Sequence, residues 1–387
     1  MLVQTNSGLE NPTSNIATKF LFKNRKLISK RAKWNEKNED RFIHLEECRD
    51  LLQQQRDTEV PRDLPYSYGN TISIFNENGV PHIQFVKHDQ TRSNPIRFTQ
   101  RGWDSFTRDV LPKSGKYLMQ ELAIMQPKLA TLSTNTFTLS KRDDFRTFRT
   151  IEMEMENGQM DRVVRFIHKT TQGSYTAIDN LELFNMLLDE PILRDSHVLD
   201  FNVQDIGMRC RFLLCPREEL TVLNKVYPAM EVRNSEVGMG SVYLGAMGIR
   251  PSCDNGMHSV SVQGVHRFAH RWDPNRIANN IVGAREDILS HANGICSIHQ
   301  QALDVAIDSL DLEHFLMTEL KKEGFNKSEV NKVIDSGMSH PTTTALPCLA
   351  QGLDAITIMA QEYNTSRQLE MEIVASKIGK RGLAQFA

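Results

Sequence analysis

One cysteine and three histidines lie within the short segment Ile249–Arg271 (IRPSCDNGMHSVSVQGVHRFAHR). These candidate metal ligands are Cys253, His258, His266 and His270. Thiolate sulfur and imidazole nitrogen bind zinc and other borderline metals. Because His266 and His270 are four residues apart, a helix or a strand would place both on one face. Zinc is therefore the one candidate cofactor, and its chemistry would be that of a metal-dependent enzyme.

The spacing of this set differs from that of standard zinc fingers, and only two nearby carboxylates could support the ligands, Asp254 and Asp273. In a metal-dependent enzyme one of them would act as the base. In the alternative interpretation, Cys253 is buried as a small apolar residue and His258 lies in a turn. The other two histidines then line a polar sheet face and bind no metal. The sequence leaves both interpretations open.

A third interpretation joins the histidines to basic and aromatic neighbours. The segment Val265–Arg285 contains four arginines and a single acid, Asp273, with two aromatic residues between them. Cations that follow phosphates and rings that stack on bases form a single-strand binding groove. Basic strand faces in DRVVRFIHK and GMRCR would extend such a groove. The residues expected to contact nucleic acid are Arg162, Arg165, Lys169, Arg209, Arg211, Arg267, Phe268, Arg271 and Trp272.

Glycines and asparagines follow the basic strands and are expected to shape their bends and turns. These residues are Asn234, Gly238, Gly240, Asn255 and Gly256. The glycines of GMGSVYLGAMG (Gly238–Gly248) fit neither the dinucleotide fingerprint nor a phosphate loop. The chain also lacks the GxSxG and HExxH motifs. The best-known nucleotide, esterase and metalloprotease chemistries therefore have no support.

The secondary structure predicted from the sequence changes along the chain from mixed, through mainly strands, to helices. Asn-Gly pairs predict two hairpins, one in Asn70–His88 and one around Asn157-Gly158. Alternating side chains predict a strand in Gly207–Cys215, whereas helical patterns continue from Asn275 almost to the end. This segregation predicts an α+β fold, with a β-rich central antiparallel sheet and a helical C-terminal third.

Composition narrows the classes of protein. The 387 residues carry a net charge of −2 and are 40% hydrophobic, so no overall basic excess indicates nucleic acid. The six cysteines are scattered, and neither a leader nor a membrane span is recognisable, so we expect a cytoplasmic protein with reduced thiols. Lys19–Lys33 is rich in lysine and arginine. It is either a solvated arm or a phosphate-contacting arm beside Trp34.

Three motifs resemble those of the phage/plasmid-like proteins grouped as domain of unknown function 932. They are GSYTAIDNLELF (Gly173–Phe184), NSEVGMGS (Asn234–Ser241) and RPSCDNGM (Arg250–Met257). SHPTTTALPCLAQGLDAIT (Ser339–Thr357) is similar to the family's linker and following helix, although Asp354 replaces its usual asparagine. The resemblance covers roughly 94–378 and implies a bacteriophage or plasmid setting, among functions of DNA replication and recombination.

These observations predict three parts of the chain. Residues 1–93 form an extension with the basic arm, a helix and a hairpin, 94–378 form the phage/plasmid-like domain, and 379–387 form a tail. We expect a non-enzymatic DNA-binding accessory protein that prefers single strands and can form homo-oligomers. The alternatives are the metal-dependent enzyme described above and an assembly-forming or inhibitory protein.

Overall fold

The computed structural model describes most of the chain as two compact units. The described residues are 28–31, 43–68, 70–77, 80–86, 89–111, 116–141, 144–154, 158, 160–169, 175–189, 193, 196–204, 207–214, 226–250, 257–339, 347–363 and 365–387. Among the described residues, those within 51–177 and 236–239 belong to the first unit, and those within 28–50, 178–235 and 240–387 belong to the second. The expected boundary at residue 93 falls inside the first unit. Most of the basic arm lies outside the described residues.

A six-stranded sheet forms the centre of the second unit in the described part of the chain, and each neighbouring pair of strands is antiparallel. Its strands, in spatial order, are β1 (Ile28–Arg31), β8 (Val198–Gln204), β9 (Gly207–Leu213), β10 (Tyr227–Asn234), β11 (Val242–Arg250) and β12 (Met257–Phe268). Strands β8 to β12 follow one another along the chain, so each pairs with its sequence neighbour. The predicted β-rich antiparallel centre is confirmed.

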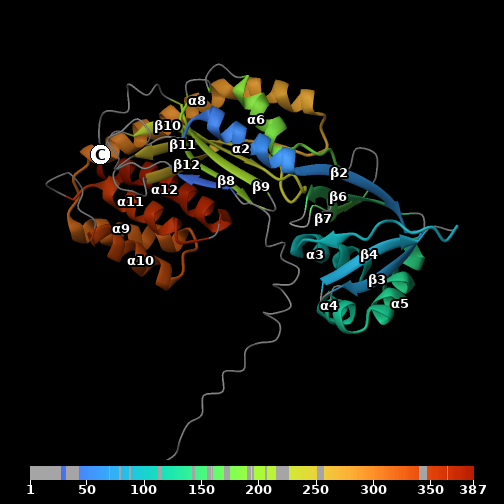
Figure 1. The fold of residues 1–387 in the computed structure, drawn as a ribbon. Coiled ribbons are helices and arrows are strands. Elements are labelled where there is room, and N and C mark those ends of the chain that lie inside the picture. Colours follow the sequence, from blue (N-terminus) through green and yellow to red (C-terminus); the bar gives the residue numbers. More distant parts are fainter. Residues whose placement is uncertain are drawn as a thin grey trace, which may run out of the picture. The chain divides into compact units, whose positions relative to one another are not determined.

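Helices cover both faces of this sheet (Figure 1). The helices α6 (Asn180–Leu188) and α8 (Pro274–Asp304) lie on one side, which we call the α8 face, and α12 (Thr365–Phe386) lies on the other, the α12 face. The sequence of strand β9 places a different kind of side chain on each face of the sheet. Met208, Cys210 and Phe212 alternate with Arg209 and Arg211, so the apolar side chains share one face and the arginines the other.

The remaining helices pack beside the sheet in a core of their own. They are α9 (Ser309–Lys322), α10 (Lys327–Ser339) and α11 (Leu349–Ala360), together with α12. This confirms the helical C-terminal third. The last part of the helical pattern forms two helices, α11 and α12, and the residues 379–387 expected as a tail continue α12 to Phe386. Gly379 lies inside α12 and does not end it. A β-carbon built on Gly379 would lie 3.0 Å from Leu353 Cδ1, so glycine at this position allows close packing against α11.

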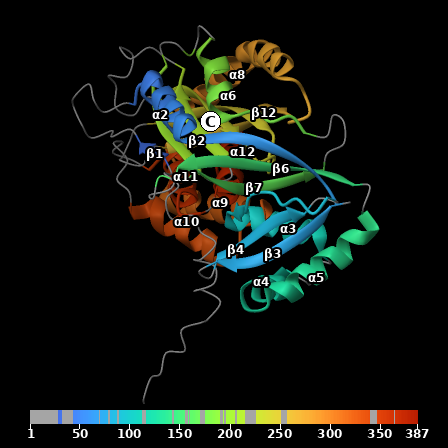
Figure 2. The same cartoon turned by 45° about the vertical axis from the view of Figure 1, so that its right-hand side comes forward.

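The first unit has a smaller mixed sheet and a separate hairpin (Figure 2). The sheet contains β2 (Glu59–Ser67), β6 (Phe145–Glu154), β7 (Met160–Lys169) and β5 (Arg97–Phe98), and the hairpin contains β3 (Thr71–Glu77) and β4 (Val80–Val86). Strands β6 and β7 form the second predicted hairpin, and Gly158 beside its turn has a φ of 74°. Both predicted hairpins are therefore confirmed.

Four helices accompany these strands, namely α2 (Leu45–Thr58), α3 (Gln100–Val110), α4 (Lys116–Met125) and α5 (Pro127–Thr138), with the short η2 (Leu139–Lys141). The division between the two units falls within α2. Helix α3 begins at Thr99, whose hydroxyl accepts a hydrogen bond from the Gly102 amide at 3.0 Å. Its buried Trp103 and Phe106 pack against Phe98 of β5, so aromatic contacts fix α3 on the sheet.

Candidate nucleic-acid interface

Two rows of polar side chains cross the α12 face of the six-stranded sheet. Directly paired residues of antiparallel strands project to the same side, so the register defines each row. The first row is Asn202, Arg209, Arg233, Tyr243 and Arg267. The second is Asp200, Arg211, Glu231, Gly245 and Val265. The sheet therefore gathers four arginines that are far apart in the sequence.

Arg211 lies at the buried centre of these rows. Its Nε donates to Glu231 Oε2 at 2.6 Å, and its Nη2 donates to Glu372 Oε1 at 3.0 Å. These three side chains are at most 2% exposed. Burial raises the pKa of Glu372, whereas for Glu231 the charges of Arg211 and Arg233 outweigh burial and lower the pKa. The network joins α12 to the sheet, and the expected exposure of Arg211 is wrong.

Arg209 lies nearer the surface but is also paired. Its Nη2 donates to Asp200 Oδ2 at 2.6 Å, and its Nη1 donates to Gln368 Oε1 of α12 at 3.0 Å. The side chain is 22% exposed. Because the acid partner already neutralises the guanidinium, Arg209 offers less to a phosphate than its position in the sequence suggested.

The residues of β7 that were predicted to contact nucleic acid belong to the first unit. Arg165 is 1% exposed, and its Nη1 donates to Glu236 Oε2 at 2.7 Å, so it cannot act as the surface cation that we expected. Arg162 pairs with Glu152 and is 33% exposed. Lys169 is exposed at the end of the strand and has contacts within the protein. Alternation predicted a basic face, but the partly buried acids Glu236 and Glu152 compensate two of its cations.

Three arginines near the end of β12 have no acid partner in the described part of the chain. Arg267 lies on the strand, Arg271 in the following turn and Arg276 in the first turn of α8, and all three are exposed. Half-buried Trp272 lies among them, with the Arg276 guanidinium 4.3 Å from the centroid of an indole ring. We call these four residues the β12–α8 surface. It combines cations that have no acid partner among the described residues with a partly exposed aromatic ring.

Two neighbours support this surface without forming part of it. Phe268 is 5% exposed on the α8 face, with its ring centroid 6.1 Å from that of Trp272. It is therefore a packing residue, and the expected stacking role is wrong. Asp273 caps α8, where its carboxylate accepts a hydrogen bond from the Arg276 amide at 2.9 Å. The acid within the basic segment thus has a structural role.

Two of the four candidate metal ligands, His266 and His270, have described side chains. His266 Nε2 lies 2.7 Å from Asp287 Oδ2, and His291 Nε2 lies 3.3 Å from Oδ1 of the same carboxylate. His270 is buried and has contacts within the protein. Cys253 and the His258 side chain lie outside the described residues. Among those described, no group of three or more histidines, cysteines or acids is placed to hold a metal ion.

The predicted turn residues have three different environments. Asn234 is buried, and its Nδ2 donates to Ile178 O and to Asn180 Oδ1, both at 2.9 Å, so two of the quoted motifs meet there. Gly238 has a φ of 67°, and a β-carbon would meet the His168 and Tyr175 rings. Gly240 is exposed, with open space around it. Asn255 and Gly256 lie outside the described residues.

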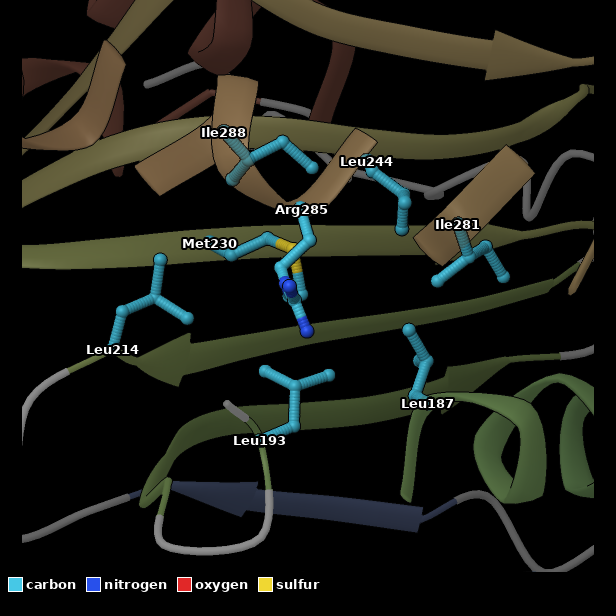
Figure 3. Close-up of a pocket in the computed structure, with 8 residues that line it drawn as sticks. All are labelled: Leu187, Leu193, Leu214, Met230, Leu244, Ile281, Arg285 and Ile288. Carbon is cyan, nitrogen blue, oxygen red and sulfur yellow. The ribbon is translucent and has the colours of Figure 1, made fainter. Parts of the chain in front are cut away.

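An apolar pocket lies on the α8 face, away from the charged rows (Figure 3). It contains about 310 Å³ of empty space, including open solvent. Seven apolar side chains and one arginine line it, namely Leu187, Leu193, Leu214, Met230, Leu244, Ile281, Ile288 and Arg285. The Arg285 side chain extends into the pocket in the view, and it has other contacts within the protein. Arg285 therefore does not belong to the β12–α8 surface.

Sequence reasoning missed three residues of the α12 face. Arg233 and Tyr243 belong to the first polar row, and Glu372 reaches the second from α12. The alternation of Glu231 and Arg233 in β10 was a local signal for a polar strand face. Nothing local connects Glu372 to Arg211, because their proximity depends on how α12 packs on the sheet.

No protein-family model, curated protein or solved structure matches this chain. The resemblance to phage/plasmid-like proteins therefore stays a prediction. None of the helices described here combines the length and the apolar character needed to cross a membrane. The geometry of the β12–α8 surface is thus the main guide to function.

Proposed function

We propose that this chain binds single-stranded nucleic acid through the β12–α8 surface and performs no chemistry on it. The observation that carries the proposal is a set of exposed arginines around the ring of Trp272 that have no acid partner among the described residues, namely Arg267, Arg271 and Arg276. Such cations neutralise phosphates and release counterions, which supplies affinity without regard to sequence. The ring supplies a platform on which an unpaired base stacks.

A single strand suits this surface better than a duplex does. The bases of a duplex already stack on one another, so Trp272 could reach a base only after unstacking it, which costs a few kcal/mol. A single strand presents its bases without that cost. The β12–α8 surface lies between the end of β12 and the start of α8. Its extent suits a short stretch of a single-stranded nucleic-acid backbone.

The biological setting of the proposal comes from the sequence resemblance. The motifs in Tyr175–Asn180 and Asn234–Ser241 are similar to those of phage/plasmid-like proteins, which implies an accessory role in DNA replication or recombination. In that setting the protein would act in the cytoplasm of a bacterial host, with single-stranded DNA as its partner. A homo-oligomer would place several copies of the surface along one strand.

Replacing Arg271 tests the proposal. Binding of fluorescently labelled oligothymidine, followed by anisotropy across a salt series, should weaken steeply with salt and be unchanged by a chelator. Because one phosphate contact is lost, Arg271→Ala should lower the slope of log affinity against log salt by about 0.7. Affinity itself should fall by a similar factor for oligonucleotides of different sequence.

The matched control is Arg101→Ala, which removes an equally exposed arginine from α3 of the first unit. It changes the net charge by the same amount and should leave both affinity and slope unchanged. Equal effects of the two substitutions would show that binding follows overall charge, and the β12–α8 surface would lose its assignment. Absence of oligothymidine binding at low salt would reject the function itself.

A further inference from the structure

Tyr243 in the first polar row is a buried aromatic residue flanked by two arginines. It is 5% exposed, and its ring centroid lies 5.2 Å from the Arg233 guanidinium carbon and 5.8 Å from that of Arg267. Its hydroxyl is buried and has no hydrogen-bond partner among the described residues. A buried hydroxyl without a partner destabilises the protein, so a bound ligand that accepts its hydrogen bond would remove this penalty.

Gly245 in the second row provides the space for this hydroxyl. A β-carbon built on Gly245 would lie 2.4 Å from Tyr243 Oη, so any larger residue would displace the ring. Burial raises the pKa of Tyr243, with Glu231 adding to the effect, so the hydroxyl stays protonated near neutral pH. The hydroxyl is therefore a hydrogen-bond donor beside Gly245, on a ring that lies close to two guanidinium groups.

Charge on the α12 face also favours an anion. The two polar rows contain four arginines, which are Arg209, Arg211, Arg233 and Arg267. Their described acid neighbours are Asp200, Glu231 and Glu372. Arg267 is the member of this set without an acid partner among the residues described, and it is exposed.

We propose that Arg233, Tyr243 and Arg267 form a subsite for one phosphate group of the bound strand. This inference rests on the proposed function, because Arg267 belongs both to the subsite and to the β12–α8 surface. Arg233 already pairs with Glu231, so Arg267 supplies the main positive charge of the subsite. The Tyr243 hydroxyl and the remaining N–H groups of Arg233 donate further hydrogen bonds to the phosphate oxygens. Since Arg267 is exposed and borders the ring, the phosphate enters by moving its side chain. The remaining phosphates follow toward Arg271.

The test compares Tyr243→Phe with the wild-type protein. This substitution removes the hydroxyl and keeps the ring between both arginines. Titration calorimetry with inorganic phosphate should show one saturable site, which Tyr243→Phe weakens about tenfold, as expected for a lost hydrogen bond to a charged group. The control Tyr363→Phe alters a tyrosine of the turn after α11 and should bind phosphate as the wild type does. Wild-type affinity in Tyr243→Phe would overturn the subsite, and so would failure of the wild type to bind phosphate.

Oligonucleotides identify which phosphate the subsite takes. If Tyr243→Phe weakens only a strand with a 5′-phosphate, the subsite holds a terminal phosphate; equal weakening of strands with and without it indicates an internal phosphodiester. Both results support the subsite. An unchanged oligonucleotide affinity in Tyr243→Phe overturns it, while the loss seen in Arg271→Ala would still support single-strand binding. The two proposals can therefore fail separately.

Discussion

Replacing Arg211 by alanine should lower the free energy of unfolding by about 3–5 kcal/mol, because it leaves a buried carboxylate without its counter-charge. Glu231 and Glu372 are both 0% exposed and accept hydrogen bonds from this one guanidinium. Glu231 keeps Arg233 as a partner, whereas Glu372 has no second cationic partner among the described residues. Loss of Arg211 therefore forces Glu372 to take up a proton or to draw in water. The effect should appear as a lower urea midpoint for unfolding.

Two controls separate this effect from ordinary ion pairing. Arg162→Ala breaks a more exposed pair with Glu152 and should cost about 0–1 kcal/mol. The triple substitution Arg211→Met, Glu231→Leu and Glu372→Leu removes every buried charge of the network, so it should cost much less than Arg211→Ala. A cost for Arg211→Ala no larger than that for Arg162→Ala would mean that the network does not hold α12 on the sheet.

Gly102→Ala should lower the free energy of unfolding of the first unit. Overpacking typically costs about 1–3 kcal/mol, and we expect a value near the upper end of that range. A β-carbon at this position would lie 2.0 Å from the Val164 carbonyl oxygen of β7. Because the obstacle is backbone within a sheet, it cannot rotate away as a side chain would. Helix α3 would have to move off the sheet and loosen the contacts of Trp103 and Phe106. Thermal and urea unfolding would both report this change.

For comparison, replacing a glycine within a helix of the second unit should raise the free energy of unfolding. Gly294 lies within α8, and a β-carbon there meets nothing within 4 Å. Because alanine favours the helix over the unfolded chain, Gly294→Ala should stabilise the protein by about 0.5–1 kcal/mol. If both substitutions destabilised the protein equally, the close approach of α3 to β7 would not be the cause.

Local pattern predicted the elements well. Alternation in Gly207–Leu213 identified a strand with two different faces, and Asn-Gly pairs identified both hairpins. Patterns failed where packing decided the outcome. The sequence predicted a tail from Gly379 onward, but Gly379 lies within α12. There its lack of a side chain allows close contact with Leu353. A glycine that ends a helix and one that allows close packing look the same in a sequence.

The candidate site was predicted in part for the same reason. Arginine spacing identified Arg267 and Arg271, which are exposed and without acid partners in the described structure. The same reasoning also selected Arg165 and Arg211, whose partners Glu236 and Glu372 are distant in the sequence. Strand alternation shows which cations share a face, but it does not show which acid will pack against them.

The most direct test of the central claim is to locate the bound strand by cross-linking. Oligothymidine substituted with 5-bromodeoxyuridine, irradiated on the protein and analysed by peptide mass spectrometry, should label Trp272. Of the other two tryptophans, Trp103 is buried and Trp34 lies in the N-terminal region outside the described residues. Labelling of Trp272 that Arg271→Ala reduces is the result we predict. Labelling confined to the Trp34 peptide, with none on the segment from Arg267 to Arg276, would contradict the claim.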